Sequence, residues 1–539
     1  MHQAQQPRPA PGLHLTLHRR NHTTTHHDGS VRDAIPWCIE RSRRTLHHPR
    51  ARRLARMLAA AIALVAARVT ASPNVSLDDP VYDELDQREL AGALPVFRGG
   101  LAPLTEARIH ELASDAPALP AGWWLRPIAR AALRIDAVHE TARGYSTTAR
   151  PRDVAGLLAL SCEGQEGRPC GNGLGLAAEL DTAAGYGAWL AGAARLRART
   201  GRDAYATGLD VDRAYVLAEL GPIAAEIGRD VLVLGPASHT QVGWSSNPPP
   251  LDQIRLSGTR PLAVAPWLGV NAVYALGRLA APQSYPGNLV SIARAQLDLG
   301  DRVELGAMQL LQLGGDGAPG FGVRDFVLEH VRRRDASAGA TDSSNRRVGL
   351  DVAVRIAAFG GTRLSYQLMF EDLRSQLGDA LRYDADHVAG VATRWLTVEW
   401  QRTGRRAYEH VPRVTGFTSG GRIVGDPLGP AAQAVFVAAR LPVRCSVVLP
   451  WAEVAQLASD AYTFGDGPIV RTSSGPGELR FRVGARVRVP LGELALEPEV
   501  VLEDVERESF VAGARRINAV LRGLLVWRPS ARLEATGAR

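Results

Sequence analysis

Few residues of this chain have the types and spacing that a catalytic or cofactor site needs. The run Gly315-Asp316-Gly317-Ala318-Pro319-Gly320 is a literal G-x-G-x-x-G, the pattern with which dinucleotide-binding folds approach a pyrophosphate. Such a fold requires an apolar parallel strand before the glycines, whereas the preceding run contains Asp301, Arg302 and Glu304. A proline also sits inside the motif. We therefore interpret it as a long loop and expect no cofactor.

The sequence gives no better evidence for a hydrolytic site or a metal-binding site. Ser419 lacks the glycine two residues before it, so its surroundings do not match a nucleophile elbow. The sequence contains no H-E-x-x-H and no C-x-x-C, which are common zinc patterns. Glu399, Glu409 and Asp386 would form a glycosidase-like couple only at a suitable separation in space. We expect a protein that is not an enzyme and binds no metal.

The four cysteines fit an exported protein. Cys162 and Cys170 lie in a loop that contains glycine and proline, where they either form a disulfide or remain two thiols. Cys445 stands alone between the apolar stretches 441–443 and 447–449 and is predicted to be a buried thiol that packs in a core.

Positive charge is concentrated near the N-terminus. The formal net charge is +8, but residues 1–71 hold 12 Arg against three acidic residues, so they carry +9 and the rest −1. Within them, residues 57–67 are an apolar run that follows several arginines and precedes Ala71, as in a cleaved signal peptide. We predict a signal peptide over residues 50–71, preceded at 1–49 by a disordered extension or a mis-assigned start. No nucleic-acid partner is expected.

The residues after the leader change from a helical to a strand-like period. Val81, Leu85 and Leu90 fall at helical spacing, and a second short helix is predicted around 105–112. From about residue 123 the period becomes two. In residues 480–491 apolar side chains alternate with arginines, and in 493–503 they alternate with glutamates. Since only Gly492 separates these runs, they predict a tight hairpin with Arg facing Glu across it.

These runs are about ten residues long, which is longer than most strands of soluble sheets. One face of each is apolar and the other charged, as expected for strands between lipid and a polar lumen. The mature sequence has no apolar run long enough for a membrane helix. We predict an all-β protein, an antiparallel transmembrane β-barrel of about 18 strands over residues 121–528. A helical segment at 72–120 precedes it, Trp527 closes the last strand, and residues 529–539 form a tail.

Short motifs follow one another from residue 226 onward. They are EIGRDVLVLGP at 226–236, SSNPPP at 245–250, GGDG at 314–317, NRRVGLD at 345–351, YEH at 408–410, TGFT at 415–418 and GDPLGP at 425–430. In this order and spacing they resemble the Wzi-type capsule assembly family, and residues 72–77 resemble that family's mature N-terminus. The resemblance covers about residues 72–528.

The resemblance implies an outer-membrane barrel with its helical segment at the periplasmic side. It further implies a lectin that holds capsular polysaccharide or exopolysaccharide at the cell surface, with outer-membrane lipid and other polysaccharide-export proteins as further partners. Two positions depart from the family: Leu234 stands where a Trp is usual, and Asp426 where a His is usual.

Polysaccharide binding needs hydrogen-bonding groups and aromatic faces on a rigid frame. Residues of these kinds in loop-like stretches are the predicted ligand contacts; they are Tyr408, His410, Asn247, Ser246, Trp244 and Arg422. The alternative for each is a purely structural loop residue. Inward arginines form a second group, Arg355, Arg363, Arg482 and Arg486. They either attract an anionic capsule or pair with Glu497 and Glu499 inside the lumen. We favour the pairing inside the lumen.

Two other functions remain open from the sequence. A porin or polysaccharide-export channel would use the same barrel with an open lumen, and an outer-membrane hydrolase would add catalytic carboxylates to it. The fold cannot separate these possibilities, because function depends on the site that the fold carries.

Overall fold

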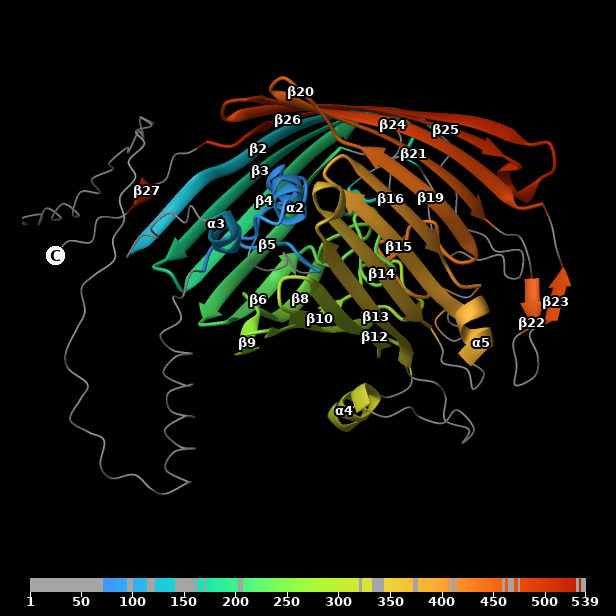
Figure 1. Cartoon of the computed structure of the whole chain (residues 1–539), viewed down its shortest axis with the longest axis horizontal. Helices are drawn as coiled ribbons and strands as arrows, with labels where there is room; N and C mark the ends of the chain where they lie inside the picture. The colour runs from blue at the N-terminus through green and yellow to red at the C-terminus, as the bar shows by residue number, and fades with distance from the viewer. Residues whose placement is uncertain are drawn as a thin grey trace, which may run out of the picture.

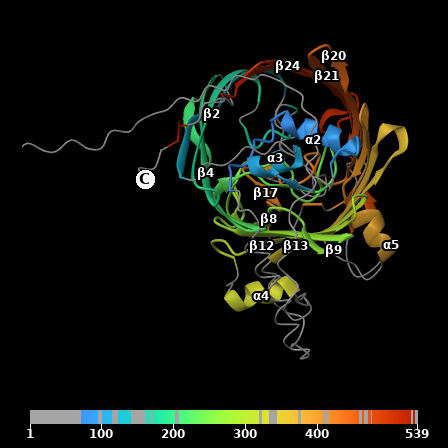
Figure 2. The same cartoon turned by 60° about the vertical axis from the view of Figure 1, so that its left-hand side comes forward.

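Alternating apolar and polar residues build a closed wall of eighteen antiparallel strands (Figures 1 and 2). This computed structural model describes residues 71–94, 100–113, 122–140, 160, 163–168, 171–201, 207–318, 322–331, 344–371, 377–405, 407–408, 413, 415–457, 461–463, 470–473, 476–529 and 533–534. The predicted barrel is confirmed. Of the predicted leader, only Ala71 belongs to the described residues, and the pair Cys162 and Cys170 lies outside them.

The wall strands follow one another around the barrel in chain order. They are β2 (Trp123–His139), β3 (Gly173–Tyr186), β4 (Leu190–Gly201), β5 (Gly208–Leu220), β6 (Ile223–Asp230), β8 (Leu251–Gly258), β10 (Leu268–Arg278), β11 (Leu289–Leu299), β12 (Val303–Leu313), β13 (Ser344–Ile356), β14 (Thr362–Phe370), β15 (Ala385–Thr393), β16 (Leu396–Arg402), β19 (Ala432–Ala439), β21 (Ser446–Leu457), β24 (Glu478–Leu491), β25 (Leu494–Glu506) and β26 (Arg515–Trp527). β26 pairs with β2 and closes the ring.

Shorter elements complete the described structure. Three extend the wall: β9 (Leu262–Ala265) pairs with β10, β20 (Leu441–Val443) with β21, and β27 (Leu533–Glu534), in the predicted tail, with β2. The others are α2 (Val81–Leu90), α3 (Glu106–Ala113), α4 (Val323–Val331), α5 (Leu377–Asp379), η2 (Ala358–Gly360), η3 (Ala380–Asp384), η4 (Glu508–Phe510), and the pairs β1 (Leu101–Ala102) with β7 (Val233–Leu234), β17 (Thr418–Ser419) with β18 (Arg422–Ile423), and β22 (Ala461–Thr463) with β23 (Val470–Ser473). No helix among the described residues is long and apolar enough to cross a membrane.

The period of two sends apolar side chains outward and charged ones inward. On β24, Phe481 and Val483 are 41% and 52% exposed, whereas Arg482 between them is buried. β24 and β25 meet in the predicted hairpin at Gly492, whose φ of +70° is readily adopted by glycine. Arg486 pairs with Glu499 across it at 2.9 Å, so the expected Arg–Glu ladder is confirmed.

The two ends of the barrel differ in the length of their connections. At one end the wall strands are joined by turns of two to nine residues, the two longest of which contain β9 and β20, and at the other most are joined by longer loops such as 231–250 and 403–431. In bacterial outer-membrane barrels the short turns face the periplasm and the long loops face the outside. The free thiol of Cys445 lies in one short turn and is exposed. The expectation of a buried thiol was wrong, because neighbouring apolar side chains here face outward from the wall.

The N-terminal segment lies inside the barrel at the end with the short turns (Figure 2). Two helices, α2 and α3, bury apolar side chains against each other in a cluster of their own. Charged groups of the wall hold this segment: Arg363 pairs with Asp86 and Glu89, both at 3.2 Å. The amide of Asn74 donates to Glu226 and Asp230, both at 2.7 Å. The lumen is therefore occupied from this end.

Arg482 tests how strongly the wall depends on its inner ion pairs. Its buried guanidinium binds Glu503, Glu453 and Glu163 at 2.7–2.9 Å. We expect Arg482→Met to lower the free energy of unfolding by about 3–5 kcal/mol, because it removes the buried positive charge that these three carboxylates share. Guanidinium unfolding of the refolded protein in detergent micelles measures this. Arg515→Met, at an exposed pair with Asp504, is the control and should leave the unfolding midpoint unchanged; an equal fall in both variants would contradict the expectation.

Candidate functional site

The loop at 231–250 turns back into the lumen from the end with the long connections. Its strand β7 pairs with β1 of the N-terminal segment, so segments that enter from opposite ends meet inside the barrel. The next residues are fixed by Glu399 of the wall, which accepts hydrogen bonds from the backbone N–H groups of Ser238, His239 and Thr240 at 2.8–3.2 Å. The loop is thereby anchored well below the rim.

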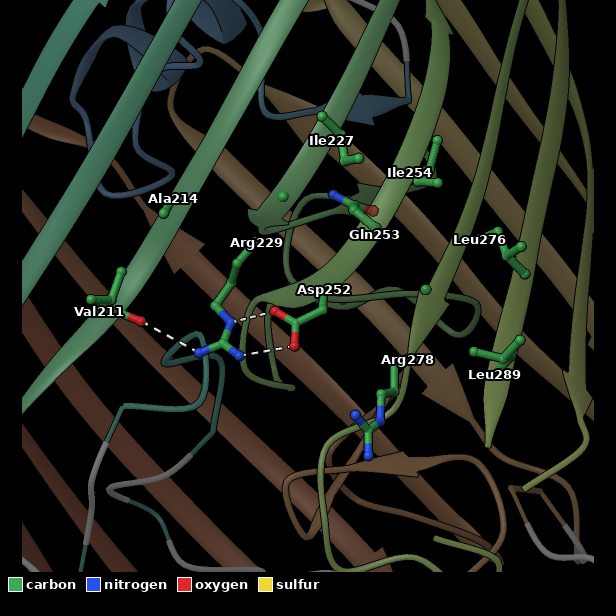
Figure 3. A pocket seen from close by; sticks show the side chains of 12 residues that line it. Val211, Ala214, Ile227, Arg229, Asp252, Gln253, Ile254, Leu276, Arg278 and Leu289 are labelled. Atoms are coloured by element: carbon green, nitrogen blue, oxygen red, sulfur yellow. Dashed lines mark hydrogen bonds and ion pairs between the residues drawn. The ribbon is translucent and has the colours of Figure 1, made fainter. Parts of the chain in front are cut away.

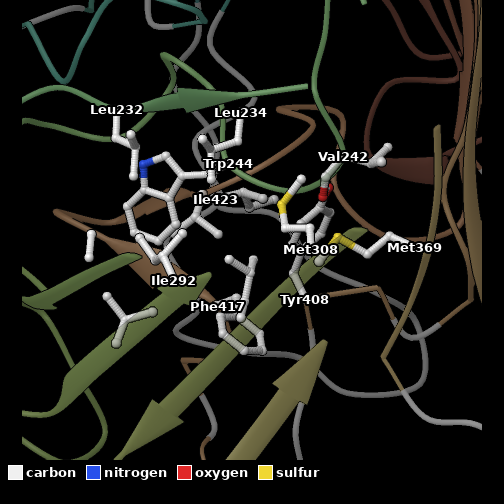
Figure 4. Packing of buried hydrophobic residues seen from close by; sticks show 14 of the residues in the cluster. Leu232, Leu234, Val242, Trp244, Ile292, Met308, Met369, Tyr408, Phe417 and Ile423 are labelled. Atoms are coloured by element: carbon white, nitrogen blue, oxygen red, sulfur yellow. The ribbon is translucent and has the colours of Figure 1, made fainter. Parts of the chain in front are cut away.

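An apolar cluster packs inside the barrel around this loop (Figure 4). Trp244 is 1% exposed and lies among Leu232, Ile292 and Phe417, with Met308 contributed by the wall. A water-filled pore would leave such side chains wet. Here they form an apolar core within the lumen, so the loop packs as part of the protein interior.

A second long loop, at 403–431, lies directly on the first. Ser245 donates its backbone N–H to the carbonyl of Val424 at 2.8 Å. The amide of Asn247 donates to the carbonyl of Ile423, also at 2.8 Å, and accepts from the backbone of Gly164 at 3.4 Å. Three loops that are far apart in the sequence are thus joined by one backbone hydrogen bond and by the side-chain amide of Asn247.

Tyr408 joins these loops to the wall. Its hydroxyl donates to the carbonyl of Val242 at 3.0 Å and accepts from the N–H of Asp426 at 2.8 Å. The guanidinium of Arg347 lies 3.9 Å from the ring centroid, a cation–π contact. Gly425 runs so close to the Tyr408 hydroxyl that a Cβ there would collide with it. This explains the glycine in the GDPLGP motif.

The structure brings the predicted contacts together but buries most of them. Trp244, Asn247, Tyr408 and Arg422 are all less than 9% exposed. Asn247 and Tyr408 make the hydrogen bonds described above, and the guanidinium of Arg422 donates to the carbonyl of Arg168 at 2.5 Å. Ser246 is partly exposed. His410 lies outside the described residues. Among the predicted contacts that the structure describes, the buried side chains hold the loops together. Ser246 is the one of them that reaches solvent.

Partly exposed polar groups lie on a fourth loop, at 279–288, and on the loop at 403–431 to which it is bonded. Ser284 and Thr415 share a hydroxyl hydrogen bond at 2.9 Å, and Gln283 donates to the carbonyl of Thr418 at 2.7 Å. Tyr285 is partly exposed, and the Arg413 guanidinium lies 5.0 Å from its ring centroid. The 282–287 stretch was not among the predicted contacts, although its aromatic residue and its amide and hydroxyl groups between prolines and a glycine are a signal in the sequence. We call Gln283, Ser284, Tyr285, Thr415 and Ser246 the roof residues.

Two of the three candidate catalytic carboxylates already accept hydrogen bonds from loop backbone groups. Glu399 accepts the three loop N–H groups described above, and Asp386 accepts from the N–H of Gly404 at 2.7 Å while pairing with Arg347. Both are 1% exposed, and Glu409 lies outside the described residues. The glycine-rich motif begins in the connection after β12, a strand paired antiparallel on both sides. This is the barrel loop expected, without a parallel βαβ unit around it.

Burial changes the acidity of two loop carboxyls under the roof. Burial raises the pKa of Asp426 to about 8, although the N–H of Leu428 donates to its Oδ1. Burial likewise raises the pKa of Glu371 to about 8 against the opposing effect of Arg347. Both groups are therefore largely protonated at neutral pH.

Comparison with known proteins agrees with this architecture. The family model for capsule assembly protein Wzi matches residues 150–442, more than half of the chain. The chain belongs to the Wzi capsule assembly family. It is an outer-membrane β-barrel, and its family places it in capsule assembly.

Among solved structures, one similar barrel is Wzi of Escherichia coli, described as an outer-membrane protein involved in group 1 capsule assembly and as a carbohydrate-binding β-barrel. It has 12% sequence identity and a TM-score of 0.58, with 86% of this chain and 100% of that chain covered. OprD of Pseudomonas aeruginosa has 8% identity and a TM-score of 0.42, covering 77% and 96%, and OccD3 of the same organism has 10% and 0.43, covering 79% and 97%. No curated protein sequence matches the chain.

Asp426 makes the packing of the roof depend on pH. A carboxyl whose pKa is raised in the folded state stabilises most when protonated, so its contribution is full below the unfolded pKa of about 3.9 and is lost as the pH rises through about 8. We expect the unfolding midpoint to fall between pH 6 and pH 9 and to fall less in Asp426→Asn, which keeps the acceptor for Leu428. Guanidinium unfolding at both pH values measures this. An identical fall in the variant would contradict the assignment.

Proposed function

We propose that this protein is a lectin that binds capsular polysaccharide or exopolysaccharide and retains or organises it at the cell surface. The observation that carries the proposal is a rigid roof over the lumen, built from four loops and supported by a buried apolar cluster. A polysaccharide needs such a pre-organised frame, since ordering flexible loops on binding would weaken the complex. The match to the capsule assembly family supports the same ligand class.

The roof residues are the proposed contacts. Ser284, Thr415 and Gln283 offer partly exposed hydroxyl and amide groups whose positions are fixed by hydrogen bonds to one another and to neighbouring backbone groups, and Tyr285 offers an aromatic face for a sugar ring. Ser246, on the loop at 231–250, adds a further partly exposed hydroxyl. The buried group around Tyr408 acts by positioning these side chains, and His410 stays a predicted contact.

The interior also argues against the two other functions. A porin needs a continuous aqueous path, whereas the N-terminal segment and the loop at 231–250 meet inside this barrel through β1 and β7. A hydrolase needs carboxylates that are open to substrate, whereas Glu399 and Asp386 are buried and hydrogen-bonded. We therefore propose a binding protein without catalytic activity.

Tyr285→Ala tests the proposed surface. We expect about tenfold weaker binding of purified capsular polysaccharide, the loss of about 1.4 kcal/mol of contact energy, with an unchanged unfolding midpoint, because the ring is partly exposed. Titration of polysaccharide from the native organism onto the purified barrel measures this, and the same variant in cells should release polysaccharide into the medium. Tyr186→Ala, also a partly exposed tyrosine but in the wall near a short turn, is the matched control.

Two results would reject the lectin. If wild-type protein does not bind the polysaccharide and a deletion strain keeps all of it attached, retention is not its role. If the protein in a planar bilayer then gives steady, large single-channel steps, the channel function replaces it.

A further inference from the structure

A groove lies on the outside of the wall, near the end with the long loops (Figure 3). It has a volume of about 640 Å³ and runs over β5, β6, β8 and β10 to the start of β11. Apolar side chains line most of it, including Ile227 and Ile254, which are 60% and 55% exposed. Arg229, Asp252 and Arg278 line it too (Figure 3). Because the protein is an outer-membrane barrel, this surface faces lipid.

The strand register arranges the groove in two layers. Arg229 lies directly opposite Asp252, which lies opposite Arg278, so the three form one row across three strands. Two residues further along the strands, away from the long loops, Ile227 lies opposite Ile254 and Ile254 opposite Leu276. A charged row at the strand ends thus borders an apolar row, as expected where the hydrocarbon layer meets the headgroups on the outer side.

The charges in this row do not cancel. Arg229 forms two hydrogen bonds with Asp252, at 2.6 and 2.9 Å. Within the described part of the chain, Arg278 makes no ion pair or hydrogen bond, and Figure 3 shows its guanidinium apart from that pair. One positive charge remains at a lipid-facing site, where a charge without a counter-ion is costly. The groove therefore suits an anion joined to an apolar chain.

The helix α4 stands on the same outer surface, outside the ring (Figure 2). His330 on this helix is bonded at 2.8 Å to Ser291 of β11, which lies opposite Leu276 of the groove. Val323 and Val327 of α4 are 83% and 57% exposed. This helix borders the groove and presents further apolar surface to the lipid headgroup region.

We propose that the groove binds a phosphorylated glycolipid of the outer leaflet. Its phosphate lies against the guanidinium of Arg278 and close to that of Arg229. A guanidinium can donate two parallel hydrogen bonds to phosphate oxygens. Its first acyl chain lies along Ile227, Ile254 and Leu276. The site is on the wall, away from the roof, so lipid and polysaccharide would occupy separate places.

The experiment uses the refolded full barrel in a non-ionic detergent, with bisphosphorylated lipid A as the probe and native mass spectrometry to count bound molecules. We expect one retained lipid per barrel, and about fivefold weaker retention in Arg278→Gln, which removes one basic group near the lipid surface. Ala214→Leu, which fills the groove beside Arg229 without changing its charge, should weaken retention too. Lipid A from which both phosphates have been removed should bind less well, and inorganic phosphate alone should not displace the intact lipid.

Arg515→Gln is the matched control, since Arg515 is also an exposed arginine near the end with the long loops but begins β26, which β2, β3 and β4 separate from β5 of the groove. It should retain lipid like the wild type. A heat-modifiability assay verifies that each variant is folded. The proposal fails if Arg278→Gln retains the lipid as tightly as the wild type, if dephosphorylated lipid binds equally well, or if the control loses as much as the groove variants.

Discussion

The arginine–carboxylate pairs on the inner face of the wall determine where the other parts of the chain can lie. A lumen of this width must be filled with water or with protein, and charges that leave water need partners. Arg130 pairs with Asp78 of the N-terminal segment at 2.6 Å and with Glu179 of β3 at 2.9 Å. Although burial opposes ionisation, Arg130 and Arg168 keep the pKa of Asp78 well below its usual range. The wall and the segment that fills it are therefore one electrostatic unit.

The lumen also contains an apolar core, which distinguishes this barrel from a water-filled pore. Trp244 and Phe417 reach it from loops on opposite sides of the wall, and Met308 closes it from a strand. Loops are usually the mobile part of a barrel. Here the buried cluster and the hydrogen bonds of Tyr408 and Asn247 give the outer loops the packing of a domain core. The roof residues consequently sit on a frame that is already ordered, which suits recognition of a repeating polymer.

The departures from the family fall within this frame. Leu234, where a tryptophan is usual, is completely buried and belongs to β7, which pairs with the N-terminal segment. Asp426, where a histidine is usual, is completely buried beside Tyr408. Both positions therefore belong to the packing below the roof and not to its partly exposed surface.

The sequence by itself determined the wall and its polarity. Alternation in 480–503 was enough for β24, the turn at Gly492 and β25, and the spacing of Val81, Leu85 and Leu90 was enough for α2, because these features depend on neighbours within a few residues. It did not determine which loop residues meet a ligand. Only the tertiary structure placed Tyr408 against Val242, 166 residues away, and Asn247 against Ile423. Polar and aromatic side chains look alike in a sequence whether they face solvent or hold two loops together; the difference depends on partners that the closed barrel brings together from distant parts of the chain.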